Sequence, residues 1–482
     1  MITKRNLPEL FVVFILLLFV LLKIPALHLP YFWDELGVYS RAGLYLHDNG
    51  LGLLPKDLPP ELSRGHPLLF AFIQAIGYNI FGDGVVGGHI TALIISLILL
   101  WSVYFITSKY FSKYTGLLAV MILIIQPLFF AQSVLILPEI SLALFVLWAI
   151  YFWLGKKYIL HGIFSTLAIL IKETAIIIPV VIIFSELIYY IVVKSKREKI
   201  IFRFKYLWVL LPFLVFGIFL LIQKQQNGWY LFPLHGDNIK ISLNRIFSFG
   251  ADYLVFLFLE QGRILLTGVI FILVILLITS KKLVYQRISI FLITLIMGGL
   301  AFNSINFYMN RYTLFVLVPF VMLSSAVIMQ CIQKYRFVLL ILPIIFFAGI
   351  YCMYGKELWP EDTSSLNMQQ KFHYDENMSY VDFLDIQQKA IDHVMNNVGS
   401  NEFIYANFPI NVALVDSRFG YTLLVENKDF RVLNRQNTQY EIKYSLISDP
   451  GSYEYQLPDS NSILLDKLVE NNVVNVKIYR PK

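Results

Sequence analysis

The sequence has little charge and almost no cysteine. Of its 482 residues, 15% are Asp, Glu, Lys or Arg and 57% are hydrophobic. This balance excludes an ordinary soluble domain and indicates a protein that crosses a membrane several times. The two cysteines, Cys331 and Cys352, fall near opposite ends of neighbouring predicted spans, so no disulfide is expected between them.

Metal-binding motifs, internal repeats and low-complexity segments are also missing. No CxxC or HExxH spacing is present, so the residues do not indicate a metal, although a divalent ion stays open as a cofactor. The net charge of +7 comes mostly from Lys and Arg between predicted spans, where these residues set the orientation of the chain. We therefore expect a lipid bilayer around the protein and no nucleic acid partner.

Apolar runs predict about eleven membrane-spanning helices. The predicted spans are residues 7–27, 85–107, 115–132, 139–154, 159–171, 173–193, 207–223, 263–280, 286–302, 312–332 and 337–355. Every predicted inner loop carries several Lys or Arg residues, most densely at 194–205, which places the N-terminus in the cytoplasm. With an odd number of spans, the chain after residue 355 is expected on the outer side.

Composition divides the chain at Gly355. Residues 1–355 form the predicted transmembrane bundle, with outer-face helices at 34–47 and 67–81. Residues 356–482 are predicted to form a small extracytoplasmic α/β domain. Its expected elements are helices at 381–397 and 462–470 and strands at 403–406, 421–425, 430–433, 443–447 and 473–479.

The adjacent acids Asp34 and Glu35 follow the first span directly. Acids are costly near hydrocarbon and usually have a function there. Transfer of a glycosyl group needs a base to take a proton from the acceptor, and a single displacement needs one such carboxylate. The alternative is that Asp34 caps the following helix. Both interpretations stay open from the residues alone.

Further polar residues fall at the predicted outer face. Glu139 opens a span after Pro138, where it can bind sugar hydroxyls, assist Asp34 or stabilise the helix N-terminus. His66 precedes Pro67 at a helix start, where it can contact a phosphate or an acid or have a purely structural role.

Two outer-face cations are candidates for phosphate binding. Lys172 lies in a short turn, where it can bind a phosphate, pair with Glu173 or extend to the headgroups. Arg311 has a guanidinium that suits phosphate, and beside Tyr312 it can equally anchor the chain at the interface. Trp229 belongs to an aromatic loop that can stack on a sugar or lie at the interface.

In order and spacing, these motifs resemble the GT-C superfamily of polyprenyl- or dolichyl-phosphate-sugar-dependent glycosyltransferases, which includes protein O-mannosyltransferases, aminoarabinose transferases and rhizobial galacturonosyltransferases. The matching motifs are Asp34-Glu35, Gly65-His66-Pro67-Leu68, Glu139, Lys172-Glu173-Thr174 and Arg311-Tyr312. The resemblance covers residues 7–355. Family members usually have Asp where this chain has Glu139, and His-Pro-Pro where it has His66-Pro67-Leu68.

The resemblance implies a GT-C-like fold and transfer of a sugar from an undecaprenyl- or dolichyl-phosphate donor to a hydroxyl of a glycan, lipid or protein at the outer face of the plasma (inner) membrane. The implied residues are Asp34, Glu35 and Glu139 for catalysis, with Asp34 as base; Arg311, Lys172, His66 and Arg64 for the donor phosphate; and Tyr39, Trp229 and Tyr312 for substrate. The alternative is a transporter or flippase of lipid-linked sugars. It predicts charges in mid-span and repeated halves, but Glu186 is the main such charge and no repeat is found.

Overall fold

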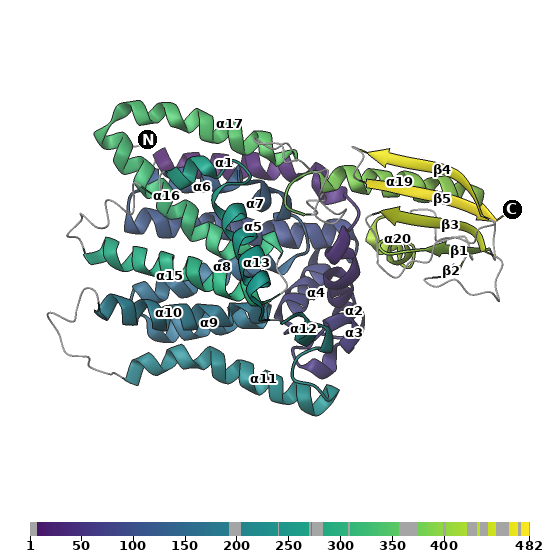
Figure 1. Cartoon of the computed structure of the whole chain (residues 1–482), viewed down its shortest axis with the longest axis horizontal. Coiled ribbons are helices and arrows are strands. Elements are labelled where there is room, and N and C mark those ends of the chain that lie inside the picture. The colour runs from purple at the N-terminus through teal and green to yellow at the C-terminus, as the bar shows by residue number, and fades with distance from the viewer. Residues whose placement is uncertain are drawn as a thin grey trace.

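The computed structural model combines a helical bundle with a small α/β domain (Figure 1). It describes residues 7–191, 204–239, 241–268, 271, 283–306, 309–355, 375–398, 402–421, 431–433, 442–449, 462–470 and 474–481. The bundle helices run roughly parallel, and the C-terminal domain sits at one end of them. The short helices α2, α3 and α4 lie at that same end (Figure 1).

The bundle is built from long apolar helices whose bounds follow the apolar runs of the sequence. They are α1 (Leu7–Lys23), α5 (Val85–Tyr110), α6 (Lys113–Ile124), α7 (Pro127–Gln132), α8 (Pro138–Leu154), α9 (Tyr158–Ile171), α10 (Ile177–Tyr189), α11 (Leu211–Asn227), α15 (Leu283–Ile305), α16 (Leu314–Lys334) and α17 (Ile341–Met353). The span predicted at 115–132 is divided into α6 and α7. Pro127 explains the break, because it has no N–H for a continuing helix and suits a first turn instead.

Within the described ranges, five helices are long and apolar enough to cross a membrane. They cover Leu7–His28, Val85–Tyr110, Leu207–Asn227, Asn310–Lys334 and Arg336–Met353. Five shorter apolar helices lie beside them. The predicted span at 263–280 falls largely outside the described residues, so the count of about eleven stays a prediction.

The outer-face helices form where the sequence predicts them. The first is a π-helical turn at Glu35–Tyr39 continuing into α2 (Ser40–Asn49), and the second is α4 (Leu69–Phe81). The short α3 (Pro60–Ser63) lies between them. Helices α2 and α4 pack closely at Gly43, where an added Cβ atom would lie 3.0 Å from the side chains of Gln74 and Tyr78.

Helix α13 (Leu243–Phe258) was not predicted, since this stretch was assigned to an outer loop. Its apolar residues are interrupted by Arg245 and Asp252, which weakens the pattern. The buried Tyr253 packs against Gly299 of α15, so tertiary contact stabilises the helix. A second short helix, α12 (Pro233–Asn238), precedes it.

The C-terminal domain has a five-stranded sheet with the order β2-β1-β3-β5-β4. Helix α19 (Tyr380–Asn397) precedes the sheet, and α20 (Ile410–Ala413) follows its first strand. The strands are β1 (Phe403–Ala406), β2 (Arg431–Leu433), β3 (Ile442–Asp449), β4 (Ser462–Glu470) and β5 (Val474–Pro481). The strand β1 is parallel to β2 and β3, whereas β5 is antiparallel to β3 and β4.

Most predictions for this domain are confirmed, but the helix at 462–470 is wrong. That segment is β4, which pairs with β5 from Ser462 to Glu470. Its run of leucines favours a helix locally, and the long pairing with β5 overrides this preference. The strand predicted at 421–425 lies outside the described residues after Tyr421.

The C-terminal domain packs directly on the residues that precede Asp34. The Tyr421 hydroxyl donates a hydrogen bond of 2.9 Å to the Tyr31 carbonyl, and the Tyr31 N–H donates one of 3.1 Å to the Phe419 carbonyl. The ring of Phe32 lies 5.7 Å from that of Phe383 on α19. This packing holds the loop that carries Asp34 against the C-terminal domain.

Candidate active site

Asp34 follows a residue in a strained backbone conformation. Trp33 has a φ of +43°, which bulky side chains rarely adopt. Its ring packs 5.1 Å from Phe408 and 6.0 Å from Phe383, both in the C-terminal domain. Asp34 makes no side-chain capping bond to the helix that follows, so the structure does not support the capping interpretation. Its carboxylate instead pairs with Arg311, and 25% of the side chain stays exposed.

Glu35 points in another direction and is fully buried. Its carboxylate accepts hydrogen bonds from His89 Nε2 at 2.9 Å, the Ile136 N–H at 2.7 Å and the Phe32 N–H at 3.0 Å. These three donors use both carboxylate oxygens. Glu35 therefore ties the loop to α5 and to the segment before α8, and it holds Asp34 in place through the backbone.

Replacing Glu35 by Ala is expected to lower the apparent melting temperature by several degrees. Three buried donors would lose their acceptor, at a cost of about 1–3 kcal/mol each. Thermal unfolding of the purified protein in detergent measures the effect. The matched control is Glu61→Gln, an exposed acid of the same outer region. Equal melting temperatures for Glu35→Ala and the wild type would contradict the assigned role.

Arg311 connects acids from three parts of the chain. Its guanidinium binds Asp34 through Nη2 and Asp375 through Nη1 at 2.8 Å, and its Nε lies 3.4 Å from Glu139. Only 3% of its side chain is exposed. Asp375 was not predicted, because it lies in a polar run that was assigned to a linker and carries no motif.

Lys172 completes this cluster. Its ammonium donates a 2.7 Å hydrogen bond to Glu139 and lies 3.8 Å from the ring centre of Tyr312. Pairing of Lys172 with Glu173 was one alternative, and it is not observed. Glu173 instead accepts a hydrogen bond of 2.9 Å from His66 Nδ1. One face of the Tyr312 ring is thus covered by the Lys172 ammonium.

Arg64 lies beside the cluster in a left-handed conformation, with a φ of +46°. Its backbone N–H donates a 2.8 Å hydrogen bond to the Pro60 carbonyl. Within the described part of the chain, its side chain forms no hydrogen bond or ion pair, and its charge acts on Asp34. The next residue, Gly65, leaves just enough room for the aromatic loop, since an added Cβ atom would lie 3.1 Å from the Trp229 ring. The Tyr39 ring stacks 6.4 Å from His66. The structure thus gathers nearly all the predicted site residues at one end of the bundle.

Burial and charge act on Asp34 in opposite directions. Burial alone would raise the pKa of its carboxyl, but the nearby cations Arg311, Arg64 and Lys172 together outweigh burial, and the pKa is lowered below its ordinary value. Asp34 is therefore ionised at neutral pH. Of the described residues, no group of three or more His, Cys, Asp or Glu side chains could hold a metal ion.

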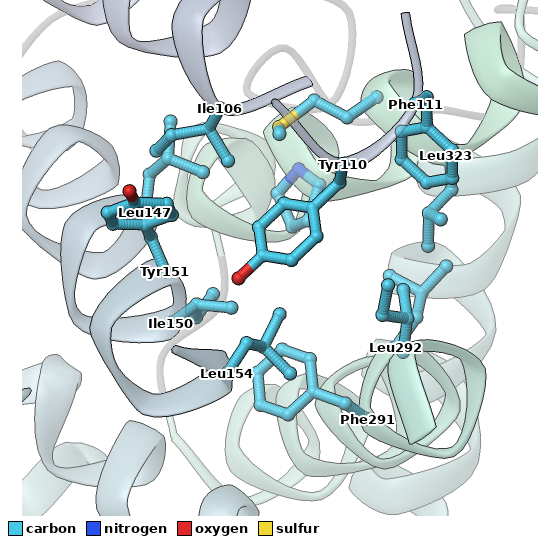
Figure 2. A pocket seen from close by; sticks show the side chains of 13 residues that line it. Ile106, Tyr110, Phe111, Leu147, Ile150, Tyr151, Leu154, Phe291, Leu292 and Leu323 are labelled. Atoms are coloured by element: carbon cyan, nitrogen blue, oxygen red, sulfur yellow. The ribbon is translucent and has the colours of Figure 1, made fainter. Parts of the chain in front are cut away.

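A separate apolar cavity lies where α5 and α8 end, at Tyr110 and Leu154 (Figure 2). Side chains of α5, α8, α15 and α16 line it, and the Tyr110 side chain points into it (Figure 2). Its lining contains no carboxylate or cation. The polar cluster around Arg311 is therefore the candidate active site.

Comparisons with known proteins identify the fold. Two crystal structures of ArnT from Cupriavidus metallidurans, one bound to undecaprenyl phosphate and one in the apo state, match the chain with a TM-score of 0.57 and 11% identity. Each match covers 96% of this chain and 97% of that chain. The chain has a GT-C fold. The resemblance to GT-C proteins inferred from the sequence is thereby confirmed, as is a multi-pass membrane protein.

Sequence comparison locates part of the GT-C fold independently. Residues 65–222 match the family model for dolichyl-phosphate-mannose-protein mannosyltransferase. This range includes His66, Glu139 and Lys172. A crystal structure of the Archaeoglobus fulgidus oligosaccharyltransferase in complex with Zn and sulfate is less similar, with a TM-score of 0.46, 12% identity, and coverage of 87% of this chain and 64% of that chain. No protein of curated function matches the chain.

Proposed function

We propose that the protein transfers a sugar from a polyprenyl-phosphate donor to an acceptor hydroxyl at the outer face of the membrane, with Asp34 as the base. One observation carries this proposal. Asp34 is ionised and a quarter exposed, whereas Glu139 and Asp375 beside it are almost fully buried. Asp34 is thus the acid of this cluster that an incoming acceptor reaches most easily.

The proposed reaction is a single displacement. Asp34 takes the proton of the acceptor hydroxyl as its oxygen attacks the anomeric carbon. The bond from that carbon to the phosphate oxygen breaks, and the polyprenyl phosphate leaves with the electron pair. Cations held in a partly water-excluded site stabilise the charge that develops on this phosphate.

Arg64 is the proposed main contact for the donor phosphate. Arg41 also acts on Arg64 electrostatically, so two like charges lie near each other. Neither side chain forms a hydrogen bond or ion pair with a described residue. Such a pair of cations favours an anionic ligand. Lys172 and Arg311 extend the positive charge toward Asp34, and His66 is held in orientation by Glu173.

The remaining site residues receive supporting roles. Glu139 holds Lys172 and lies near Arg311, and its Oε2 atom is buried with no hydrogen-bond partner among the described residues. That oxygen can accept a sugar hydroxyl. Glu35 acts as a positioning residue rather than in the chemistry. Tyr39 and Trp229 flank the Arg64 turn and are proposed substrate contacts, together with the free edge of Tyr312.

The identity of the donor is supported by the neighbouring structures. ArnT from Cupriavidus metallidurans binds undecaprenyl phosphate, and the matched family model describes mannosyltransferases that use dolichyl phosphate mannose. The Lys and Arg residues of the inner loops support an extracytoplasmic active site in the plasma (inner) membrane. We propose residues 1–355 as the catalytic domain and 356–482 as an outer domain, and the acceptor is a glycan, lipid or protein.

The alternative, a flippase, loses its main sequence argument. Glu186 accepts hydrogen bonds from Arg287 Nε at 2.8 Å and from Trp153 Nε1 at 3.1 Å. This carboxylate is therefore occupied by a structural pair. A transported substrate is not needed to explain it.

The proposal is tested by incubating the purified full chain with a panel of radiolabelled polyprenyl-phosphate sugars and candidate acceptors. Release of the sugar from one donor, with formation of a glycosylated acceptor, is the expected result. Movement of intact donor across the liposome membrane without cleavage would overturn the assignment as a transferase and favour a flippase.

Replacing Arg64 by Ala is expected to raise the KM for the donor about 10- to 100-fold, with a smaller change in kcat. A charge-assisted hydrogen bond of this kind contributes about 1.5–3 kcal/mol. Steady-state kinetics at varied donor concentration measure the effect. Lys56→Ala, which removes an exposed cation from the same outer region, is the matched control and should leave KM unchanged. An unchanged donor KM in Arg64→Ala would contradict the phosphate contact.

A further inference from the structure

Asp375 lies at the centre of the site although it comes from the chain beyond the bundle. Its Oδ2 atom accepts a 2.8 Å hydrogen bond from Arg311 Nη1, and Gln132 Nε2 lies 3.5 Å away. Only 4% of its side chain is exposed. Shortly after it, the Met378 N–H donates a 2.8 Å hydrogen bond to the Met353 carbonyl, which anchors this segment to the end of α17.

The charges around Asp375 do not balance. Three carboxylates, those of Asp34, Glu139 and Asp375, face two cations, Lys172 and Arg311. Lys172 pairs with Glu139 at 2.7 Å, so the single guanidinium of Arg311 serves both Asp34 and Asp375. Buried charges are costly unless each is matched. The ion pairs of Lys172 and Arg311 therefore leave these three carboxylates one cation short, and the charge of the nearby Arg64 acts on Asp34.

Of the three acids in this cluster, Asp375 is the one that is protonated most readily. Burial raises the pKa of its carboxyl to about 6, because the neighbouring Arg311 offsets only part of the cost of burial. The carboxylates of Glu139 and Asp34 act in the same direction as burial. Asp34 differs because Arg64 and Lys172 also act on it and lower its pKa.

We propose that Asp375 is a placeholder for the donor phosphate: it binds Arg311 while the site is empty, then takes up a proton and releases the guanidinium when the phosphate arrives. This inference rests on the proposed function. A carboxylate and a phosphate present similar oxygen pairs to a guanidinium, so one can replace the other on Arg311. The C-terminal chain thereby supplies a residue that controls donor binding.

The proposal fixes the sign of the pH dependence. A bound phosphate adds negative charge and withdraws Arg311 from Asp375, and both changes favour the protonated carboxyl. Binding therefore takes up a proton. By linkage, affinity is highest when Asp375 is already protonated and falls as pH rises above about 6, by up to about tenfold per pH unit.

The test measures the Kd of undecaprenyl methyl phosphate for the purified full chain between pH 5.5 and 8. This phosphodiester keeps one negative charge throughout, so the ligand does not titrate. We expect Asp375→Asn to bind at least tenfold more tightly than the wild type at pH 8 and to lose most of the pH dependence. Asp385→Asn, an exposed acid on α19 that pairs with Lys389, is the matched control and should behave like the wild type.

Either of two results would overturn the placeholder role and leave the proposed function intact. One is the same pH dependence in Asp375→Asn and in the wild type, and the other is weaker binding by the variant at every pH. If neither the wild type nor any variant binds the probe, and the wild type also shows no sugar transfer, the proposed function fails together with the inference.

A second measurement covers the case in which Asp375→Asn does not fold. Isothermal calorimetry of the wild type in two buffers with different ionisation enthalpies counts the protons exchanged on binding. We expect a net uptake of close to one proton per phosphodiester bound at pH 7.5. Zero uptake or net release would overturn the inference.

Discussion

The Asp34→Asn variant is expected to lose sugar transfer, with kcat at least about 1,000-fold below that of the wild type. A positioned general base contributes about 10²–10⁴-fold, and an amide cannot accept the proton of the acceptor. Donor binding should persist, because the proposed phosphate contacts Arg64, Lys172 and Arg311 are unchanged. Single-turnover kinetics with radiolabelled donor, together with donor Kd, measure the two effects separately.

The same experiment can locate the base elsewhere. Glu61→Gln is the matched control, because Glu61 is an exposed acid of the same outer region and should retain full activity. Full turnover by Asp34→Asn would contradict the assignment and move the base to another acid of the cluster, first to Glu139, whose Oε2 atom has no hydrogen-bond partner among the described residues. The lowered pKa of Asp34 also predicts that wild-type kcat stays high in mildly acidic solution, since the base remains ionised there.

Replacing Arg311 by Ala should impair both stability and turnover. Asp34 and Asp375 would lose their shared partner, and Glu139 its second nearby cation. Breaking a buried pair in this way costs about 3–5 kcal/mol. Loss of one electrostatic contact to the leaving group lowers kcat by a further 10²–10³-fold or thereabouts. Thermal unfolding and kcat at a temperature where the variant is folded measure the two effects.

Arg311→Lys separates charge from geometry. Lysine keeps the positive charge but lacks the planar fork that reaches Asp34 and Asp375 together. Relative to Arg311→Ala, we expect Arg311→Lys to regain part of the lost stability and little of the lost turnover. Arg336→Ala, which removes an exposed arginine at the start of the segment leading to α17, is the control for loss of a surface charge. Wild-type stability in Arg311→Ala would contradict the role of Arg311 as the centre of the cluster.

Much of the architecture follows from local sequence. Apolar runs located the bundle helices, and Pro-rich and polar stretches separated the outer-face helices α2 and α4 from them. The positions of Asp34, Glu139, Lys172 and Arg311 at the ends of apolar segments also led to their selection as candidates. In each case the signal is a charged residue beside hydrocarbon, which is rare unless it has a function.

Pairing within the site could not be read from the sequence. Lys172 is adjacent to Glu173 in the chain, yet it pairs with Glu139, while Glu173 pairs with His66. Neighbouring residues point in different directions, and buried charges pair with whichever partner the packing of helices brings close. Glu35 shows the same effect, since its burial against His89 is decided by the fold of the first outer loop.

The sequence by itself determined the class of protein, the limits of most apolar helices and the set of charged residues at their ends, because hydrophobic length and charge position are local properties. Tertiary structure alone decided that 462–470 is a strand, since its partner β5 lies outside the segment. It also decided that Asp375 joins Arg311, 64 positions earlier in the chain. A contact between distant segments depends on how the domain packs against the bundle, and no local pattern encodes that packing.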